Sequence, residues 1–392
     1  MLIFNLNCRK GGIHIYSVEK ARGVNFLKSF DYILFLSVLI FSFIGIIVLS
    51  SATRVMPKGA DGNRIMLAQG IGLCIGIAVC LIISTYDYRE LKRTGIIFYG
   101  ISILLLAAVL VIGTGDKLGS RSWIRVPLIG SLEPAEIAKI PFVIMVSIFL
   151  ERIKNGQWSK KDIVRLALFT GLPIALQAAE ADIGNTLVFI FTFFLLLFIA
   201  EIPYKYILMI LAPLVASLPL LWFFVLNNKR KERILVFLSP ESDPSGAGYN
   251  VLQSKMAVGA GRMFGQGLYH GLLTQNNGVP VKESDFIFSV VGEELGFIGA
   301  VIFVALIFFI LLKCVHIAKH SSDSYGSLLA VGMTSIMAFN FIENIGMAIG
   351  LMPVTGVPLP FVSQGGTALV TDFIAIGILL SVSMRRNKAL KF

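Results

Sequence analysis

Residues 31–53 read DYILFLSVLIFSFIGIIVLSSAT. The only charge in this stretch is its first residue, and the rest is apolar or small. An α-helix needs about 20 apolar residues to cross the hydrocarbon core of a bilayer. A helix that is hydrophobic on every side belongs in a membrane or in the core of a large protein. The stretch therefore predicts a transmembrane helix.

Similar apolar stretches recur along the whole chain of 392 residues. The chain is 56% hydrophobic and 15% charged, whereas a soluble domain has about 25% charged residues, so lipid must surround much of it. We predict an all-α polytopic membrane protein, a ten-helix transmembrane bundle with a long extracytoplasmic loop, 227–285, between the seventh and eighth helices. The candidate spans are 31–53, 65–85, 94–113, 134–151, 163–179, 183–200, 204–226, 286–313, 325–350 and 365–384.

The distribution of Lys and Arg predicts how the bundle is oriented. An even number of spans puts both termini on one side, and 20 of the 34 basic residues fall in segments on that side. Cytoplasmic loops are enriched in Lys and Arg, so we expect cytosolic tails at 1–30 and 387–392 around a transmembrane domain at 31–386. The net charge of +11 follows from this topology and does not indicate nucleic-acid binding.

The other side of the membrane holds segments that are more than connectors. They are 114–133, the acidic turn 180–182, the long loop 227–285 and the uncharged stretch 352–366. A loop as long as 227–285 is usually functional and partly structured, so we expect function at the outer face. The sequence has no Walker A loop, Rossmann fingerprint or Gly-x-Ser-x-Gly motif, which disfavours an ATPase, a dehydrogenase or a serine hydrolase. The four cysteines have no spacing typical of disulfides or zinc.

Two pairs of ionisable residues lie within predicted spans. Glu136 and Lys139 are three residues apart and share a helical face near the outer end of the fourth span. Because charges inside a membrane helix are costly and usually have partners, they form either a neutralised ion pair or part of an active cavity. Glu293 and Glu294 in the eighth span need a counter-charge, for which Lys139 or an arginine of the outer loops is a candidate. We favour helix docking over catalysis for these two acids.

Three further polar positions border the outer face. Asp285 opens the eighth span, where it could cap the helix, accept a proton from a substrate hydroxyl, or do both. Asp182 opens the sixth span and could cap it or line the outer cavity. Arg121 stands close to Trp123, and a Trp at this depth is more often a membrane anchor than a ligand contact.

Five ordered motifs carry a resemblance to a known family. They are GSRSWI (119–124), LEPAEIAK (132–139), EADIGNT (180–186), QSKMAVGAG (253–261) leading to DFIF (285–288) and GEELG (292–296), and PVTGVPLPF (353–361) followed by Ser363, Gly365 and Gly366. From Asp31 to about Arg386 the chain resembles the SEDS (shape, elongation, division and sporulation) family, the RodA/FtsW-type polymerases of bacterial peptidoglycan. The resemblance implies a ten-helix bundle that polymerises lipid II at the outer face of the bacterial cytoplasmic membrane.

The resemblance also implies roles for individual residues. The catalytic Asp of the family matches Asp285, and its fourth-helix Glu and Lys match Glu136 and Lys139. Supporting positions within the motifs are Arg121, Trp123, Asp182, Gln253, Lys255, Ser363, Gly365 and Gly366. The chain departs from the usual pattern at Glu133 and Ala135 (Gln-Pro-Ser-Glu in the family), at Ala181 and Asn185 (Pro-Asp-x-Gly-Thr), and at Gln364 (Tyr). None of these departures touches Asp285, Glu136 or Lys139, so we expect them to affect substrate detail and partner choice rather than activity.

The mechanism that the resemblance implies is an inverting glycosyl transfer with Asp285 as general base. Lys139 and Arg121 are candidates to stabilise the departing undecaprenyl diphosphate, and a divalent cation is another. The implied partners are a class B penicillin-binding protein (a transpeptidase) and other proteins of an elongation or division complex. The short tails and the Asp31-Tyr32 start favour the RodA-like, elongation type. A lipid II flippase or transporter and a non-catalytic scaffold for a transpeptidase are the alternatives.

Overall fold

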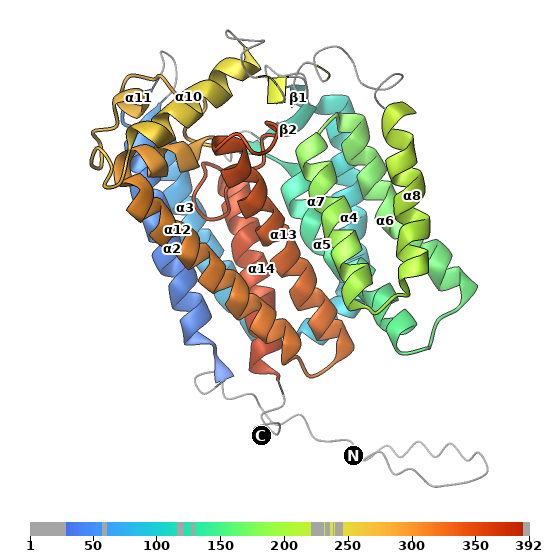
Figure 1. The fold of residues 1–392 in the computed structure, drawn as a ribbon. Helices are drawn as coiled ribbons and strands as arrows, with labels where there is room; N and C mark the ends of the chain where they lie inside the picture. The colour runs from blue at the N-terminus through green and yellow to red at the C-terminus, as the bar shows by residue number, and fades with distance from the viewer. Residues whose placement is uncertain are drawn as a thin grey trace, which may run out of the picture.

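The computed structural model describes residues 29–56, 61–115, 121–126, 130–220, 231, 236, 237, 239 and 246–386. Long helices stand side by side as a bundle (Figure 1). They are α2 (Tyr32–Ala52), α3 (Gly62–Thr85), α4 (Leu91–Ile112), α5 (Pro134–Lys154), α6 (Lys160–Glu180), α7 (Ile183–Ile199), α8 (Tyr204–Leu220), α12 (Ile287–Lys319), α13 (Ser324–Ala348) and α14 (Gly366–Met384). The short helices α10 (Ala247–Ala260) and α11 (Leu272–Gln275) lie at one end of the bundle, which we call the loop end.

Seven of the described helices are long and apolar enough to cross a membrane, counting α4 together with the short helix η1 (Tyr88–Glu90) that precedes it. The apolar helix α7 has 17 residues, and α5 carries charged residues at both ends. The predicted fold class, a helical multi-pass membrane protein, is therefore confirmed. The count of ten spans stays a prediction, although the described helices follow the predicted stretches closely.

The centre of the bundle is formed by α5, α13 and α14, whose residues are mostly buried. Glycines allow these central helices to approach one another and the neighbouring helix α3 closely. Close packing of this kind is usual in membranes, where packing rather than the hydrophobic effect drives helix association. A Cβ on Gly332 of α13 would lie 2.2 Å from Val143 of α5, and one on Gly76 of α3 would lie 2.6 Å from Phe373 of α14. The outer helices α2, α3, α4 and α8 expose large apolar side chains, as lipid-facing helices do.

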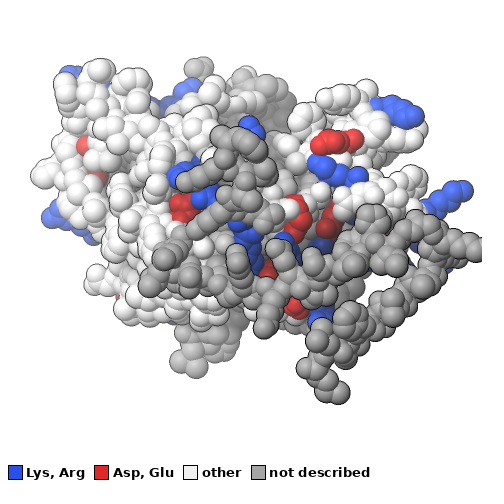
Figure 2. All heavy atoms as spheres, turned by 90° about the horizontal axis from the view of Figure 1, so that it is seen from below, with Lys and Arg blue, Asp and Glu red and all other residues white. Residues whose placement is uncertain are grey.

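The opposite end of the bundle, where α2 begins and α14 ends, is held by ion pairs. Figure 2 shows basic and acidic side chains mixed on this face, which we call the termini end. Asp323 caps α13 and also accepts hydrogen bonds from the Tyr88 hydroxyl and the Arg89 guanidinium. Exposed ion pairs of this kind contribute little to stability, because water screens their charges. Ion pairs at this end include Arg89–Asp323, Lys92–Glu151, Lys154–Glu201, Arg385–Asp87 and Arg152–Asp162.

The segment between α4 and α5 forms a small antiparallel sheet that the sequence did not predict. Its strands are β1 (Thr114–Gly115), β2 (Arg121–Val126) and β3 (Gly130–Leu132), in the order β1-β2-β3. In this sheet Trp123 pairs with Thr114, and Ile124 pairs with Leu132. The strands lead directly into Glu133 and the start of α5, so they fix where that helix begins.

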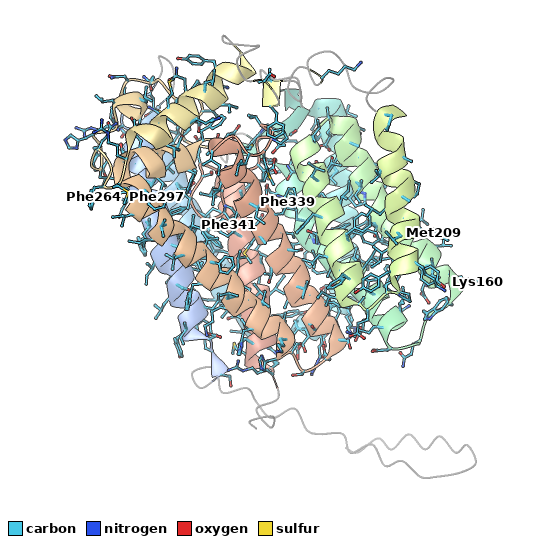
Figure 3. The ribbon with its side chains drawn as sticks, viewed as in Figure 1. Lys160, Met209, Phe264, Phe297, Phe339 and Phe341 are labelled. Carbon is cyan, nitrogen blue, oxygen red and sulfur yellow. The ribbon has the colours of Figure 1, made fainter. Side chains whose placement is uncertain are left out.

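Helix α12 is broken near its start by Gly296, whose φ of 69° is not helical. The glycine-rich loop 261–267 fills the break. The Gln266 and Gly267 amides donate to the carbonyls of Glu293 and Glu294, both at 3.0 Å. The amides of Phe297 and Ile298 donate to the carbonyls of Arg262 and Met263, at 2.8 and 3.1 Å. Backbone that leaves the helical pattern at membrane depth needs such partners, so the loop and the helix break form one unit. The backbone of Phe264 lies close to Gly296 at this point, and the side chains of Phe264 and Phe297, labelled in Figure 3, are both exposed.

Candidate functional site

At the loop end, the backbone around Asp285 is clamped from two directions. The Ser363 hydroxyl donates to the Ser284 carbonyl at 2.6 Å, and the Gln364 amide donates to the Glu283 carbonyl at 2.8 Å. From α13, the Asn344 side-chain amide donates to the carbonyl of Asp285 at 3.1 Å and to that of Val357 at 2.9 Å. The segment 353–366 and the start of α12 are therefore joined around this aspartate.

The Asp285 side chain is half-buried and faces this segment. Its Oδ1 accepts a hydrogen bond from the Ser284 hydroxyl at 2.9 Å, and a Cβ on Gly356 would lie 3.7 Å from its Oδ2. The prediction that Asp285 caps the helix is wrong. Helix α12 begins at Ile287 with Phe286 at the N-cap position, because the apolar Phe286, Ile287 and Phe288 are all buried in the bundle.

Glu136 and Lys139 form the ion pair that their spacing predicted. The Lys139 ammonium lies 2.7 Å from Glu136 Oε1, and both side chains are at most 2% exposed. The ion-pair interpretation is therefore confirmed, while a role in the reaction stays a prediction. In this structure Lys139 is buried and already neutralised, so contact with a substrate requires the segments above it to move.

A second group of acidic residues lies at the start of α5 and α7. The Asn185 amide nitrogen donates to Glu133 Oε1 at 2.8 Å and to Asp182 Oδ2 at 2.9 Å, so it bridges the two carboxylates. Asp182 Oδ1 also accepts from the Asn185 backbone amide, which confirms Asp182 as the N-cap of α7. Burial and the nearby charges of Glu136 and Asp182 raise the pKa of the Glu133 carboxyl well above its ordinary value.

Glu293 and Glu294 dock the outer loop, as we favoured. Glu293 accepts from the backbone amides of Leu273 and Thr274 at the start of α11 and from the Thr274 hydroxyl, at 2.6 to 2.9 Å. Glu294 accepts from the Ser51 hydroxyl of α2 at 2.6 Å and from the Gln275 side chain at 3.1 Å. The expected counter-charge Lys139 is paired elsewhere, with Glu136.

Lys282 is a member of this network that the sequence analysis missed. Its ammonium donates to the Val55 carbonyl and to Asn277 Oδ1, both at 2.9 Å, and to the Thr274 carbonyl. Burial lowers the pKa of Lys282, against the raising effect of Glu283, Glu293 and Glu294. Lys282 joins the end of α2 to the loop that precedes Asp285, a contact between distant parts of the chain that no local sequence pattern indicated.

Most of the other predicted residues lie in the same region. Arg121 and Trp123 are on β2, and Gly365 and Gly366 stand at the start of α14. Gln69 of α3, which the sequence analysis did not single out, donates to the Ser363 carbonyl at 3.1 Å and accepts from the Gly365 amide at 3.3 Å.

The predicted residues of α10 have other surroundings. Lys255 is exposed, and its aliphatic stem lies against Gly350. Gln253 is half-buried on the same helix. The residue between them, Ser254, anchors α10 by donating to the Ala348 carbonyl at 2.7 Å. Its place within the QSKMAVGAG motif was the signal for it.

The candidate divalent cation finds no obvious ligand set. Among the residues that the structure describes, no group of three or more His, Cys, Asp or Glu side chains is arranged to hold a metal ion.

A bundle of apolar helices with a clamped carboxylate and buried charges at its loop end defines a multi-pass membrane protein with a polar site at one end. The profile of the FtsW, RodA and SpoVE family, described as "Cell cycle protein", matches residues 31–388, and the chain belongs to this family.

Its relatives include peptidoglycan glycosyltransferases. The chain is 34% identical to the peptidoglycan glycosyltransferase MrdB of Escherichia coli K12, over 84% of this chain and 88% of the relative. It is 32% identical to the probable peptidoglycan glycosyltransferase FtsW of Geobacter metallireducens, over 92% of this chain and 96% of the relative. A chain in a solved peptidoglycan synthase complex that coordinates polymerization and crosslinking matches with a TM-score of 0.76 and 27% identity, over 92% of this chain and 99% of that chain.

Proposed function

We propose that the chain polymerises lipid II into glycan strands at the outer face of the bacterial cytoplasmic membrane, with Asp285 as general base. The 4-hydroxyl of an acceptor GlcNAc attacks the anomeric carbon of a MurNAc held on undecaprenyl diphosphate. Asp285 accepts the hydroxyl proton while the bond from the anomeric carbon to the diphosphate oxygen breaks. Attack from the face opposite the leaving group inverts the anomeric centre.

The clamped backbone of Asp285 is the observation that carries this proposal. A general base must be held within hydrogen-bond reach of the proton that it takes. Hydrogen bonds from Asn344, Ser363 and Gln364 fix residues 283–285, while the Asp285 carboxylate stays half-buried rather than sealed in the bundle. In contrast, both carboxylate oxygens of Glu293 are engaged in docking the loop. Glu294 is buried and accepts hydrogen bonds from Ser51 and Gln275 through one oxygen, so both residues are poor candidates for this role.

The leaving diphosphate gains negative charge as the bond breaks, and a cation nearby lowers the energy of that state most in a water-poor site. Lys139 and Arg121 are the cations that we propose for this role. Lys139 is buried and paired with Glu136, so its ammonium reaches the diphosphate only when the site opens as substrate binds.

The test is a pair of matched acid-to-amide variants in purified protein with labelled lipid II. Asp285→Asn, and Asp285→Ala beside it, should abolish glycan-strand formation while the protein remains folded, because an amide cannot accept the proton. Glu283→Gln changes the neighbouring acidic side chain and should keep at least half of the activity. Strand formation by Asp285→Asn at the wild-type rate would show that another group is the base.

The same reaction in detergent separates the alternatives, since detergent leaves no barrier to cross. Strands in detergent mean a polymerase. Lipid movement across vesicles without strands means a flippase, and neither result means a scaffold. The confirmed pairing of Glu136 with Lys139 and the docking roles of Glu293 and Glu294 leave fewer free intramembrane charges for a transport path than the sequence suggested.

Orientation and partners are part of the proposal. The termini end faces the cytoplasm and the loop end faces outward, as the distribution of basic residues predicts. A transpeptidase of the class B penicillin-binding type crosslinks the strands, which is supported by the similarity to a chain of a synthase complex that coordinates polymerization and crosslinking. Two relatives are named peptidoglycan glycosyltransferases, and a solved structure at 25% identity is named a rod shape determining protein of Thermus thermophilus. We propose the elongation role for this chain.

A further inference from the structure

The middle of α14 carries a buried aspartate that has no part in the chemistry proposed above. Asp372 is 5% exposed, and it lies within electrostatic reach of the Glu136–Lys139 pair. A carboxylate in a membrane helix is costly and usually marks a function or a specific partner. The sequence analysis placed this residue inside the tenth predicted span and did not single it out.

The partner of Asp372 is the backbone of a strained turn. The Phe361 amide donates to Asp372 Oδ2 at 3.1 Å. Phe361 has a φ of 65°, in the left-handed region that residues with a bulky side chain rarely adopt. Such a conformation persists only when the surrounding structure enforces it, and a carboxylate that accepts the amide hydrogen bond is one way to enforce it.

Packing holds the same turn from the other side. The Phe361 ring is buried and contacts Phe41 of α2 and Phe373 of α14, with centroid distances of 6.4 and 5.5 Å. On α2 only a glycine fits, because a Cβ on Gly45 would lie 2.8 Å from the Phe361 carbonyl oxygen. The turn is therefore wedged between two helices, with Asp372 supplying its polar contact.

From this turn a short chain of hydrogen bonds leads to Asp285. The amides of Val362 and Ser363 donate to the Leu359 carbonyl at 3.2 and 3.0 Å, which closes the turn. The Ser363 hydroxyl accepts from the Leu359 amide at 2.9 Å and donates to the Ser284 carbonyl at 2.6 Å. Ser284 is the residue before Asp285, so the position of the turn sets the position of the aspartate.

We propose that Asp372 is a positioning residue for the reaction, which acts through the Phe361 turn and Ser363 to hold Asp285 in place. The proposal rests on the proposed function, because it takes Asp285 as the base.

The test compares three variants of the purified full-length protein. Asp372→Asn keeps an oxygen that accepts from the Phe361 amide, so its kcat should stay within about threefold of the wild type. Asp372→Ala removes the acceptor, and kcat should fall about 10- to 100-fold at unchanged KM, since a displaced catalytic group costs rate rather than binding. Thr371→Ala is the matched control, because Thr371 is equally buried on the same helix and takes no part in the hydrogen bonds described for the turn.

Hydrogen exchange gives a readout that does not depend on catalysis. Amides of residues 359–364 should exchange faster in Asp372→Ala than in the wild type or in Asp372→Asn, while α13 stays unchanged. If Asp372→Ala does not fold, Asp372→Val fills the space without an acceptor and takes its place. Wild-type kcat in the Ala or Val variant would overturn the proposal. Equal losses in the Asn, Ala and Thr371→Ala variants would overturn it too.

The Asp285→Asn variant, measured beside these, separates this proposal from the proposed function. An active Asp285→Asn variant would refute Asp285 as the base, while faster exchange at 359–364 in Asp372→Ala would still show that Asp372 holds the turn. An inactive Asp285→Asn variant together with a fully active Asp372→Ala variant would refute the positioning role alone.

Discussion

At the scale of single residues, Asn185 shows how one side-chain amide can hold two carboxyl groups close together. Its amide bridges Glu133 and Asp182, while Lys139 neutralises Glu136 a turn further into α5. Three carboxyl groups therefore share one nearby lysine and one bridging amide. Because burial penalises charge more than a neutral amide can repay, the pKa of the Glu133 carboxyl is raised well above its ordinary value.

Replacement of Glu133 should therefore change how stability depends on pH. Burial, then the charges of Glu136 and Asp182, raise the pKa of Glu133 in the folded protein. Between the unfolded value of 4.5 and this higher folded pKa, the folded state binds more protons, so the free energy of unfolding falls as pH rises. Glu133→Gln removes this loss. Its thermal midpoint at pH 7 to 8 should exceed that of the wild type by roughly 2–4 °C.

The control for this prediction is the same comparison in acid. Below the unfolded pKa both states of the wild type carry the proton, so the difference between Glu133→Gln and the wild type should disappear there. The measurement is the thermal midpoint of each purified protein across the pH range. A midpoint difference that is the same at every pH would mean that the amide acts through packing and that Glu133 does not titrate between the two states.

Sequence reasoning succeeded for residues whose partners are close in the chain and failed for distant ones. Glu136 and Lys139 pair because a helix brings residues three apart together. Asp182 caps α7 through Asn185, three residues on. In contrast, Lys282 reaches Val55 across 227 positions, and the contact of Asp372 with Phe361 depends on a turn that folds back on α14. No local pattern encodes these contacts, since they arise from how the helices pack.

At the scale of elements, the break in α12 explains why the loop before it is rich in glycine. Gly261 packs against the carbonyls of Gly292 and Glu293, and Gly265 meets the backbone of Glu294. The sequence showed the two glycine motifs, one in the long loop and one in the eighth span, without showing that they face each other. The prediction of one continuous span at 286–313 also hid the break, because hydropathy reports solvent environment and not backbone conformation.

Two alanine substitutions on the same stretch of chain should have opposite effects. A Cβ on Gly261 would lie 1.9 Å from the Gly292 carbonyl oxygen, whereas one on Gly259 would meet nothing within 4 Å. Gly261→Ala should therefore destabilise the protein by about 1–3 kcal/mol or more, as overpacking against backbone does. Gly259→Ala lies in α10 and should be neutral or stabilising by up to about 1 kcal/mol.

Thermal unfolding and lipid II polymerisation of both variants check this prediction. Gly261→Ala should lose both stability and activity, because the displaced loop carries α11 and leads to Asp285. Equal stability of the two variants would mean that the loop 261–267 and the break in α12 are not packed against each other as described.

At the scale of the whole molecule, the apolar stretches predicted the helices to within a few residues, because the length of a span is set by bilayer thickness. The sheet of β1, β2 and β3 was not predicted, since its short strands lie in a segment that reads as a polar loop. The sequence also did not predict that α5, α13 and α14 form the centre of the bundle. These helices carry small and polar residues that pack and pair inside the bundle, a property that hydropathy alone cannot distinguish from weak membrane character.

Orientation across the membrane is the property on which an outward-facing site depends, and it can be measured directly. Asn276, after α11, is exposed at the loop end, and Gln157, between α5 and α6, is exposed at the termini end beside basic residues. In a chain whose native cysteines are replaced by serine, Asn276→Cys in spheroplasts should react with a membrane-impermeant maleimide. Gln157→Cys should react only after the membrane is opened, because basic loops stay in the cytoplasm. The reverse labelling pattern would put Asp285 on the cytoplasmic side, where strands of cell wall cannot be made, and would refute the proposed function together with the topology.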